Sequence, residues 1–290
     1  MSTNLTAQPT TGEVLARLRA LLPSLQPSDR RVAQAVLNQP DAAIYWSVNE
    51  MADAAKTSTA TVVRCAKKCG FKGYHDLKLA VAQERAAFKA DDAERVDDGD
   101  RRTAVVRQVT RTGAQTVRDA GVLVDPAAFD AAVQAISGAR AVLFSGVGTS
   151  APLAQDAAYR FTAIGITSLA PADVHVQHVT ARQLDATDVC IVVSHTGQTR
   201  ETLAVANAAK AAGATVVAIT SFARSPLSEL AGHTIVAGTR EVAFRLEAMA
   251  SRLAHLAMLD ALLVAVAALD DDRTQASLAL YSDALTEHRL

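Results

Sequence analysis

The feature that most restricts the fold of this chain is a short apolar run that ends in a polar, glycine-containing loop. The run is Val189–Val193, and the loop Ser194–Thr199 reads SHTGQT. A helical pattern begins directly afterwards, over residues 201–212. An apolar run of this length is too short for a buried helix, but it suits a strand that is covered on both faces. The sequence therefore predicts a buried parallel strand that passes through a tight polar turn into a helix.

The same plan of strand, turn and helix recurs along the second half of the chain. Further strands are predicted over 141–145, 215–220 and 234–237, and the first is followed by the turn GVGTS and a helix. A long apolar helix over 246–268 closes this region. Units of this kind build an α/β doubly wound parallel sheet, in which ligands bind beyond the carboxyl ends of the strands. Both polar turns are expected at that edge.

The loop after the strand at 189–193 has the chemistry of an anion site. Backbone N–H groups at a helix start lack partners within the helix, and the helix dipole favours negative charge there. The loop carries hydroxyl groups and a glycine, but neither a general base nor a pair of metal ligands. We therefore expect it to hold an anionic small molecule, with no metal and no cofactor, rather than to transform one.

The amino-terminal quarter of the chain reads as a series of short helices with identifiable starts. Ser47 with Glu50 forms a predicted capping box, and Ser58 is the expected cap of the following helix. Ser28 or Asp29 is expected to cap an earlier helix. This region is therefore predicted to be all-α.

The net charge of −1 hides a basic amino-terminal region. Residues 1–90 contain 12 Lys and Arg against 7 Asp and Glu, whereas the rest of the chain contains 17 against 23. A basic end on an acidic remainder suggests that this end meets a polyanion. The asymmetry alone is weak, because many proteins of similar charge bind no nucleic acid.

Within this basic region, the segment from Ser47 to Lys78 predicts two short helices separated by about three residues. The second helix has small hydroxyl residues at its start and cations farther along. That is the arrangement of a recognition helix, whose first residues approach base edges while cations reach phosphates. Val62, Val63 and either Cys65 or Ala66 are expected to face the core. The candidate DNA contacts are Ser58, Thr59, Thr61, Arg64, Lys67 and Lys68. By pattern alone, an ordinary helical hairpin with a solvated basic face is an equal alternative.

The cysteines and the lack of a targeting signal favour the cytoplasm. Cys65 and Cys69 stand four residues apart on a predicted helix, which is too rigid for a disulfide, and Cys190 lies in a strand. No stretch approaches about 18 uninterrupted apolar residues, and the amino terminus lacks the pattern of a secretion signal. We expect three reduced, packed thiols and a cytoplasmic protein with no membrane partner.

The segment SVNEMADAAKTSTATVVRCAKKCGFKGYHDLK closely resembles the helix-turn-helix of the RpiR/MurR family of bacterial transcription regulators. The residues that match its consensus in register are Ser47, Glu50, Ala52, Ser58, Ala60, Thr61, Val62, Val63, Arg64, Lys67, Lys68, Gly70, Phe71, Gly73, Tyr74 and Lys78. The chain departs from the consensus at the turn, where Lys56-Thr57 replaces the usual Gly-Val, and at Cys65 and Cys69, which replace Phe and Leu. The resemblance implies double-stranded operator DNA as a partner.

The second half resembles the sugar isomerase (SIS) domain that members of this family carry. FSGVGTSAPLAQDAAYRFTAIG matches its first glycine turn and helix, and SHTGQTRETLAVANAAKAAGATVVAIT matches its serine/threonine loop, which binds the phosphate of a phosphosugar. The ligand contacts implied by the resemblance are Ser150, Ser194, His195, Thr196, Gly197, Thr199 and Glu247. His195 could instead lie at a subunit interface or in solvent. Glu247 falls near the place of the carboxylate base in SIS isomerases, but Arg245 and Arg252 are close enough to neutralise it, which favours an ion pair or a sugar-hydroxyl contact.

These resemblances imply a multidomain protein, an all-α helix-turn-helix domain followed by an α/β doubly wound parallel-sheet SIS domain. The expected bounds are 12–88 for the first domain, 89–124 for a linker with an acidic run and a connecting helix, 125–270 for the SIS domain and 271–290 for a carboxyl-terminal tail. The implied function is a regulator, not an enzyme, that senses a phosphorylated sugar or amino sugar and assembles as a homodimer or tetramer through the SIS domain. The alternative is a sugar-phosphate isomerase or lyase with an accessory helical domain, in which the recognition helix would have no purpose.

Overall fold

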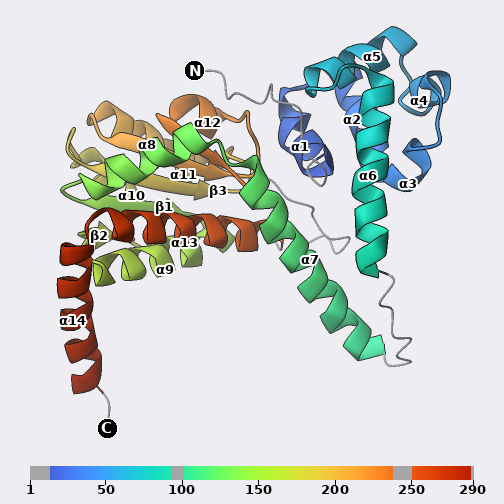
Figure 1. Cartoon of the computed structure of the whole chain (residues 1–290). Coiled ribbons are helices and arrows are strands. Elements are labelled where there is room, and N and C mark those ends of the chain that lie inside the picture. The colour runs from blue at the N-terminus through green and yellow to red at the C-terminus, as the bar shows by residue number, and fades with distance from the viewer. Residues whose placement is uncertain (1–13, 93–100, 238–249, 289–290) are drawn as a thin grey trace.

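The computed structural model describes residues 14–92, 101–237 and 250–288. Figure 1 shows a helical domain and a sheet-containing domain, with helix α7 (Arg101–Leu123) running between them. The helices of the first domain are α1 Val14–Leu21, α2 Pro27–Asn38, α3 Pro40–Ala43, α4 Val48–Ala54, α5 Thr59–Lys68 and α6 Tyr74–Asp92. The predicted order, an all-α domain followed by an α/β domain, is therefore confirmed. Eight residues of the predicted acidic run, 93–100, lie outside the described residues.

Side-chain caps fix where α4 and α5 begin. Ser47 accepts a hydrogen bond from the Glu50 backbone while the Glu50 carboxylate accepts one from Ser47, so the predicted capping box is present. Ser58 Oγ accepts a hydrogen bond from the Thr61 amide at 3.3 Å and caps α5, as predicted. These caps satisfy amide donors that have no partner inside a helix.

Helix α2 begins two to three residues earlier than the sequence indicated. Its N-cap is Gln26 and Pro27 is its first helical residue, so neither Ser28 nor Asp29 is the cap. Proline suits this position because it has no amide hydrogen to satisfy. Asp29 is instead fully buried in the first turn of the helix.

The turn between α4 and α5 keeps a left-handed residue although it lacks the usual glycine. Lys56 has φ of 49° and is the one non-glycine residue with positive φ in the described part of the chain. Arg31 on α2 holds this turn, because its guanidinium donates hydrogen bonds to the carbonyl oxygens of Ala55 and Lys56 at 3.0 and 3.1 Å. The helix-turn-helix geometry is therefore retained with lysine in a conformation that glycine adopts more readily.

The second domain is built on a five-stranded sheet in which every pair of neighbouring strands is parallel. The strand order is β2-β1-β3-β4-β5, and the bounds are β1 Val142–Gly146, β2 Ser168–Leu169, β3 Val189–Ser194, β4 Thr215–Thr220 and β5 His233–Val236. The four predicted strands are present. Strand β2 was not predicted, because two residues at a sheet edge leave no apolar run to detect.

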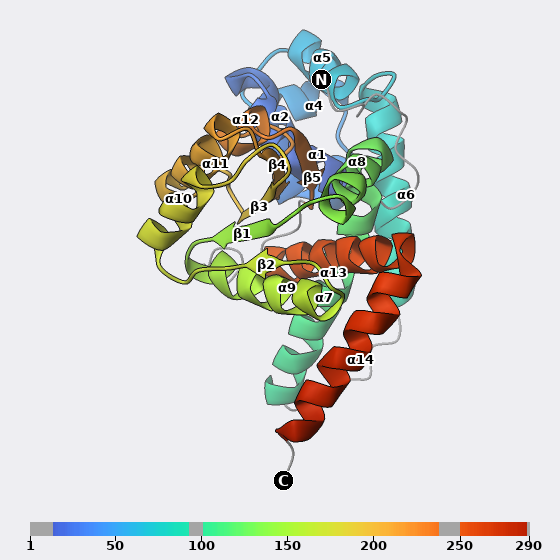
Figure 2. The same cartoon turned by 90° about the vertical axis from the view of Figure 1, so that its left-hand side faces the viewer.

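Helices cover both faces of this sheet, and successive residues of β3 alternate between the two faces. Ile191 belongs to the core cluster that includes α8, α9 and α13, whereas Cys190 and Val192 belong to the cluster of α10 and α11. Figure 2 shows these two layers on opposite sides of the strands. The helix bounds are α8 Pro126–Ser137, α9 Ala151–Ala163, α10 Val174–Arg182, α11 Arg200–Ala211, α12 Pro226–Leu230 and α13 Ser251–Leu269. The three cysteines are free and buried.

Helix α13 is the long apolar helix that was predicted at the end of this domain. It is the one described helix that is long and apolar enough to cross a membrane by length and composition. Its buried residues recur every three to four positions, and it packs against α7, α8 and α9, as a core helix does. The region predicted as a carboxyl-terminal tail contains a further helix, α14 Asp271–Glu287, which packs on α9 and α13.

Candidate DNA-reading helix and effector loop

Helix α5 packs against α2, α4 and α6 through one face and leaves the other exposed. Val62 is fully buried, as predicted, and Thr61 is only 7% exposed. Val63 is 36% exposed. The predicted orientation is therefore wrong for Thr61 and Val63, because the outward ridge of the helix lies about one residue from its expected place. The exposed residues of α5 are Thr59, Ala60, Val63, Arg64, Lys67 and Lys68.

Two of the candidate DNA contacts, Arg64 and Lys68, are held by the buried carboxylate of Asp29. Arg64 Nη2 lies 3.0 Å from Asp29 Oδ1, and Lys68 Nζ lies 2.6 Å from Asp29 Oδ2. Burial by itself raises the pKa of Asp29, but the hydrogen bonds and charges of Lys68 and Arg64 lower it below the usual value. The two cations remain 47% and 40% exposed, so they keep a fixed direction while still facing solvent.

Of the other candidate contacts, two make hydrogen bonds within the helical domain and two lie at its surface. Ser58 caps the helix, and the Thr61 hydroxyl lies 3.0 Å from the Ser58 hydroxyl and 3.3 Å from Arg64 Nη2. Thr59 and Lys67 line an open surface hollow. The importance of Asp29 was missed because an acid in the first turn of α2 has the sequence pattern of a cap. Only its packing against α5 distinguishes the two roles.

In the second domain, the two polar turns flank the point where the strand order reverses. From β1 the sheet extends to β2 on one side and to β3 on the other, with Gly146 in register with Val193. The carboxyl edge at such a point is where doubly wound sheets bind ligands. Ser150 follows β1, occupies the N-cap position of α9 and is 8% exposed. Residues 194–199 follow β3 and lead into α11.

The loop 194–199 uses part of its hydrogen-bonding capacity to fix its own shape. Ser194 Oγ accepts a hydrogen bond from the Gly197 amide at 3.1 Å, and Thr196 Oγ1 accepts one from the Gln198 amide at 3.3 Å. Within the described structure, Thr199 occupies the N-cap position of α11 without a side-chain cap hydrogen bond. The first turn of α11 therefore presents amide donors and a hydroxyl group to an anion.

Gly197 is required by both backbone conformation and packing. Its φ is 64°, and a Cβ at this position would lie 2.7 Å from Ser225 Cβ and collide with the Ser225 hydroxyl. Its carbonyl accepts a hydrogen bond from the Leu227 amide at 3.1 Å. The loop is thus clamped against the segment that follows β4.

His195 is held by two hydrogen-bonded side chains that no sequence pattern indicated. His195 Nδ1 lies 2.7 Å from Ser221 Oγ, which lies 3.0 Å from His255 Nε2 on α13. His255 is 1% exposed. Burial, and to a lesser degree the charge of His195, lowers the pKa of His255 to about 3, so His255 is neutral at physiological pH. Glu247, the remaining predicted ligand contact, lies outside the described residues.

The segment 221–225 also contacts the helical domain. The Ala223 amide donates a hydrogen bond to the carbonyl of Ala20, near the end of α1, at 3.2 Å. The small apolar cluster around this contact consists of Ala16, Ala20, Leu123, Ala223 and Val236. Helix α1 in turn packs against α2 and α6. One short segment therefore touches both the polar loop and the domain that carries α5.

Comparison with known proteins matches both halves of this chain to known domains. The rpiR-family helix-turn-helix domain matches residues 12–87, and the SIS domain matches residues 135–265. An uncharacterised HTH-type transcriptional regulator of Caldanaerobacter subterraneus subsp. tengcongensis is 32% identical, with 88% of this chain and 90% of the relative aligned. The HTH-type transcriptional regulator HexR of Pseudomonas aeruginosa is also 32% identical, with 87% and 88% aligned.

The solved structure of the Vibrio vulnificus NanR protein complexed with ManNAc-6P is similar over 95% of this chain and 99% of that one. Its TM-score is 0.61 and its sequence identity is 25%. Among the described residues, no group of three or more His, Cys, Asp and Glu side chains could hold a metal ion. With an rpiR-type helix-turn-helix followed by a SIS domain, this chain belongs to the RpiR family of HTH-type transcriptional regulators.

Proposed function

We propose that this chain binds operator DNA through α5 and that a phosphorylated sugar in the loop 194–199 alters this binding. The observation that carries the proposal is the double contact of the segment 221–225. Ser221 bonds His195 of the loop through both its amide and its hydroxyl, and Ala223 bonds Ala20 of the helical domain. A ligand regulates DNA binding only if the DNA-competent and DNA-incompetent arrangements bind it with different affinity. If this segment moves between the two arrangements, the loop that it contacts would bind the ligand with different affinity in each.

The chemistry of the loop supports a phosphorylated sugar or amino sugar as the effector. A phosphate would accept hydrogen bonds from the amides at the start of α11 and from the hydroxyl groups of Ser194, Thr196 and Thr199, with Ser150 and His195 beside them. Gly197 allows the backbone to approach closely. Because the NanR relative is complexed with ManNAc-6P, this compound is the first effector to test.

The SIS domain in this proposal senses its ligand without converting it. Sugar isomerisation needs a general base close to the reacting carbon. In the loop 194–199 the one side chain that can accept a proton is His195, and its Nδ1 is engaged with Ser221 Oγ at 2.7 Å. For Glu247, which lies outside the described residues, we propose a sugar-hydroxyl contact or an ion pair rather than proton abstraction. The protein would act in the cytoplasm as a homodimer or tetramer formed by the SIS domain. Such an assembly would place two α5 helices on a palindromic operator.

The proposal is tested by measuring operator binding with and without effector. A duplex selected in vitro from a random pool would be labelled and followed by fluorescence anisotropy, with ManNAc-6P, glucosamine 6-phosphate and glucose 6-phosphate as candidate effectors. We expect sequence-specific binding that at least one of these compounds shifts by about 5- to 150-fold. NMR of the same compounds with the protein should show no turnover. Lack of specific DNA binding, or catalytic turnover, would contradict the proposal.

The coupling between domains is tested at Ala223, which is 7% exposed against α1. Ala223→Leu overfills this small cluster without touching the loop 194–199. We expect the effector to bind with nearly the same affinity but to shift DNA binding much less. The matched control is Arg224→Ala, because the neighbouring side chain is exposed. Full coupling in Ala223→Leu would show that the two domains communicate elsewhere.

A further inference from the structure

The outward face of α5 carries an apolar side chain where the sequence indicated only polar ones. Val63 is 36% exposed, whereas its neighbour Val62 is fully buried. Ala60 is also exposed, one turn earlier on the same ridge. Figures 1 and 2 both place α5 at one extremity of the molecule, with α14 at the other. The ridge is therefore an open surface of the helical domain.

Val63 lies between two shallow hollows that share it and Val48 at the start of α4. One hollow is also lined by Thr59, Ala60, Arg64 and Lys67. The other is also lined by Ser47, Gly73, Tyr74, His75 and Lys78. None of these described lining residues is acidic. An apolar strip bordered by cations is complementary to a polyanion that presents apolar groups between its charges.

Two of the cations beside Val63 are restrained and therefore border the strip in fixed positions. Asp29 holds Arg64 at 3.0 Å, and Lys78 Nζ donates a hydrogen bond to the Trp46 carbonyl at 3.3 Å. When such cations meet phosphates, they set how the helix lies on the duplex but carry no sequence information. Sequence discrimination must then come from the groups between them. On this ridge, those groups are largely apolar.

In the major groove of DNA, the C5-methyl group of thymine is the apolar feature that distinguishes a base. We propose that Val63, flanked by Ala60 and Val48, contacts a thymine methyl group and makes the chain prefer thymine at one position of each operator half-site. This inference rests on the proposed DNA-binding function. Val63 is then a specificity-determining residue, while Lys67 contributes affinity through phosphate.

The test uses the full chain and a duplex selected in vitro from a random pool. Each thymine of the half-site is replaced in turn by deoxyuridine, which lacks only the methyl group. Burial of one methyl group is worth about 0.8 kcal/mol, which corresponds to a roughly fourfold loss of affinity at the contacted position. Other thymines should tolerate the replacement.

Val63→Ala then identifies the side chain that senses the methyl group. In this variant we expect thymine and uracil duplexes to bind equally at the contacted position, and Val63→Thr provides a variant of nearly the same volume. Lys67→Ala is the matched control on the same ridge. It should weaken both duplexes equally and reduce the salt dependence by about one phosphate contact.

The outcomes distinguish this inference from the function on which it rests. A thymine-to-uracil difference that persists in both Val63 variants would overturn the inference and leave DNA binding intact. Failure to enrich any sequence would contradict the proposed function itself. Specific DNA binding with no sensitive thymine would show that the strip serves another contact, such as an apolar protein partner.

Discussion

The candidate DNA-reading surface of α5 and the candidate effector loop 194–199 obtain their polarity in different ways. On α5, the polar groups are long charged side chains, and a buried carboxylate determines where two of them point. In the loop 194–199, the polar groups are backbone amides and short hydroxyl groups at the start of a helix. Which side chains α5 exposes depends on the rotation of the helix about its axis. Which groups the loop exposes depends on where strand β3 ends.

This difference determines how each site responds to substitution. Removing the side chain of Arg64 or Lys68 from α5 also affects the packing of α2 against α5, because both pair with Asp29 of α2. The Thr199 hydroxyl can be removed with the strand, Gly197 and the amides left in place, because it makes no side-chain cap hydrogen bond in the described structure. We therefore expect changes in the loop to alter ligand affinity, and changes at Asp29, Arg64 or Lys68 to alter stability together with DNA binding.

The largest effect is expected for Ser194→Ala combined with Thr199→Ala. Each lost hydrogen bond to a charged phosphate should weaken effector binding by about 1.5–3 kcal/mol, or roughly one to two decades in affinity. Operator affinity without effector should change little. The measurement is operator binding at increasing effector concentration, and an unchanged effector midpoint would place the ligand elsewhere.

Thr199→Ser is the matched control for this pair, because it keeps the hydroxyl group at the N-cap position of α11. We expect its effector midpoint to stay close to that of the parent. Ser194 also accepts the Gly197 amide, so the thermal stability of the double variant must be measured alongside. Loss of effector binding in Thr199→Ser as well would indicate that the loop, rather than a hydroxyl contact, has been disturbed.

The next largest effect is expected on the helical domain, for Asp29→Asn. The neutral amide cannot hold both cations, and hydrogen bonds to a charged group contribute about 1.5–3 kcal/mol. We expect the free energy of unfolding in urea to fall by this amount at pH 7. Because the folded pKa of Asp29 lies below its value of 3.8 in the unfolded chain, its contribution is present above that pH and is lost as the pH falls further.

Asp53→Asn serves as the control for Asp29→Asn, since it makes the same change at an exposed residue of α4 in the same domain. If Asp29→Asn unfolds at the same urea concentration as the parent at pH 7, the ion pairs with Arg64 and Lys68 contribute no stability. In that case the cations are held only by solvent-exposed contacts, which are weak.

A buried neutral histidine gives the SIS domain a different pH window. The folded pKa of His255 is about 3 and the unfolded value is 6.5, so the unfolded chain takes up a proton as the pH falls below 6.5. Stability should therefore fall by about 2 kcal/mol between pH 6.5 and 5 from this residue alone. His255→Gln, which does not titrate, should reduce this loss in urea unfolding followed at both pH values. An equal pH dependence in parent and variant would assign the loss to other groups.

The two sites differed in how far the sequence predicted them. Strand β3 and the loop after it could be located because an apolar run, a glycine and a helical pattern leave few alternatives. The predicted outward face of α5 was displaced by about one residue from the observed one. Thr61 was therefore predicted to be exposed and Val63 to be buried, and the structure shows the reverse. These two residues lie on opposite faces of the helix, and either choice of buried face leaves one β-branched side chain exposed. Only contacts with α2 and α4 decide which of them is buried. Ser221 directly follows β4 and His255 lies on α13, and no local sequence pattern connects either residue to the loop.

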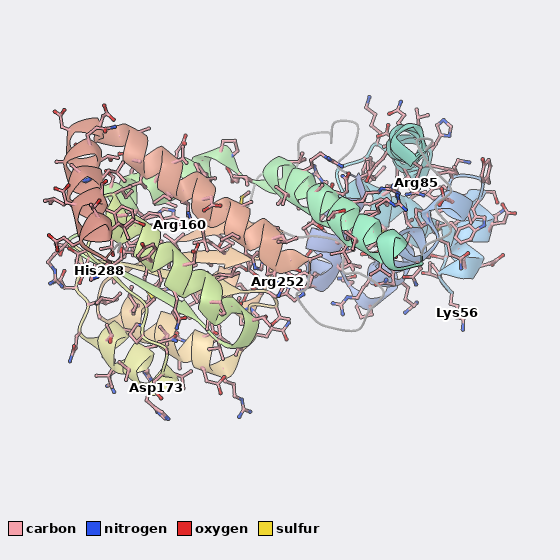
Figure 3. All side chains as sticks on the ribbon, turned by 90° about the horizontal axis from the view of Figure 1, so that it is seen from below. Lys56, Arg85, Arg160, Asp173, Arg252 and His288 are labelled. Carbon is pink, nitrogen blue, oxygen red and sulfur yellow. The ribbon has the colours of Figure 1, made fainter. Side chains whose placement is uncertain are left out.

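The smallest effect is expected in the turn that joins α4 to α5. Lys56 adopts a left-handed conformation, which costs an L-residue about 1–2 kcal/mol, while glycine loses about 0.5–1 kcal/mol of backbone entropy on folding. Lys56→Gly should therefore raise the free energy of unfolding by roughly 0.5–1 kcal/mol. Figure 3 places Lys56 at the outer edge of the helical domain, so its side chain offers little packing to lose. Lys56→Ala is the control, because it removes the same charge but keeps the conformational strain. Equal stability of the two variants in urea would show that Lys56 is not strained, and that the turn tolerates lysine without a penalty.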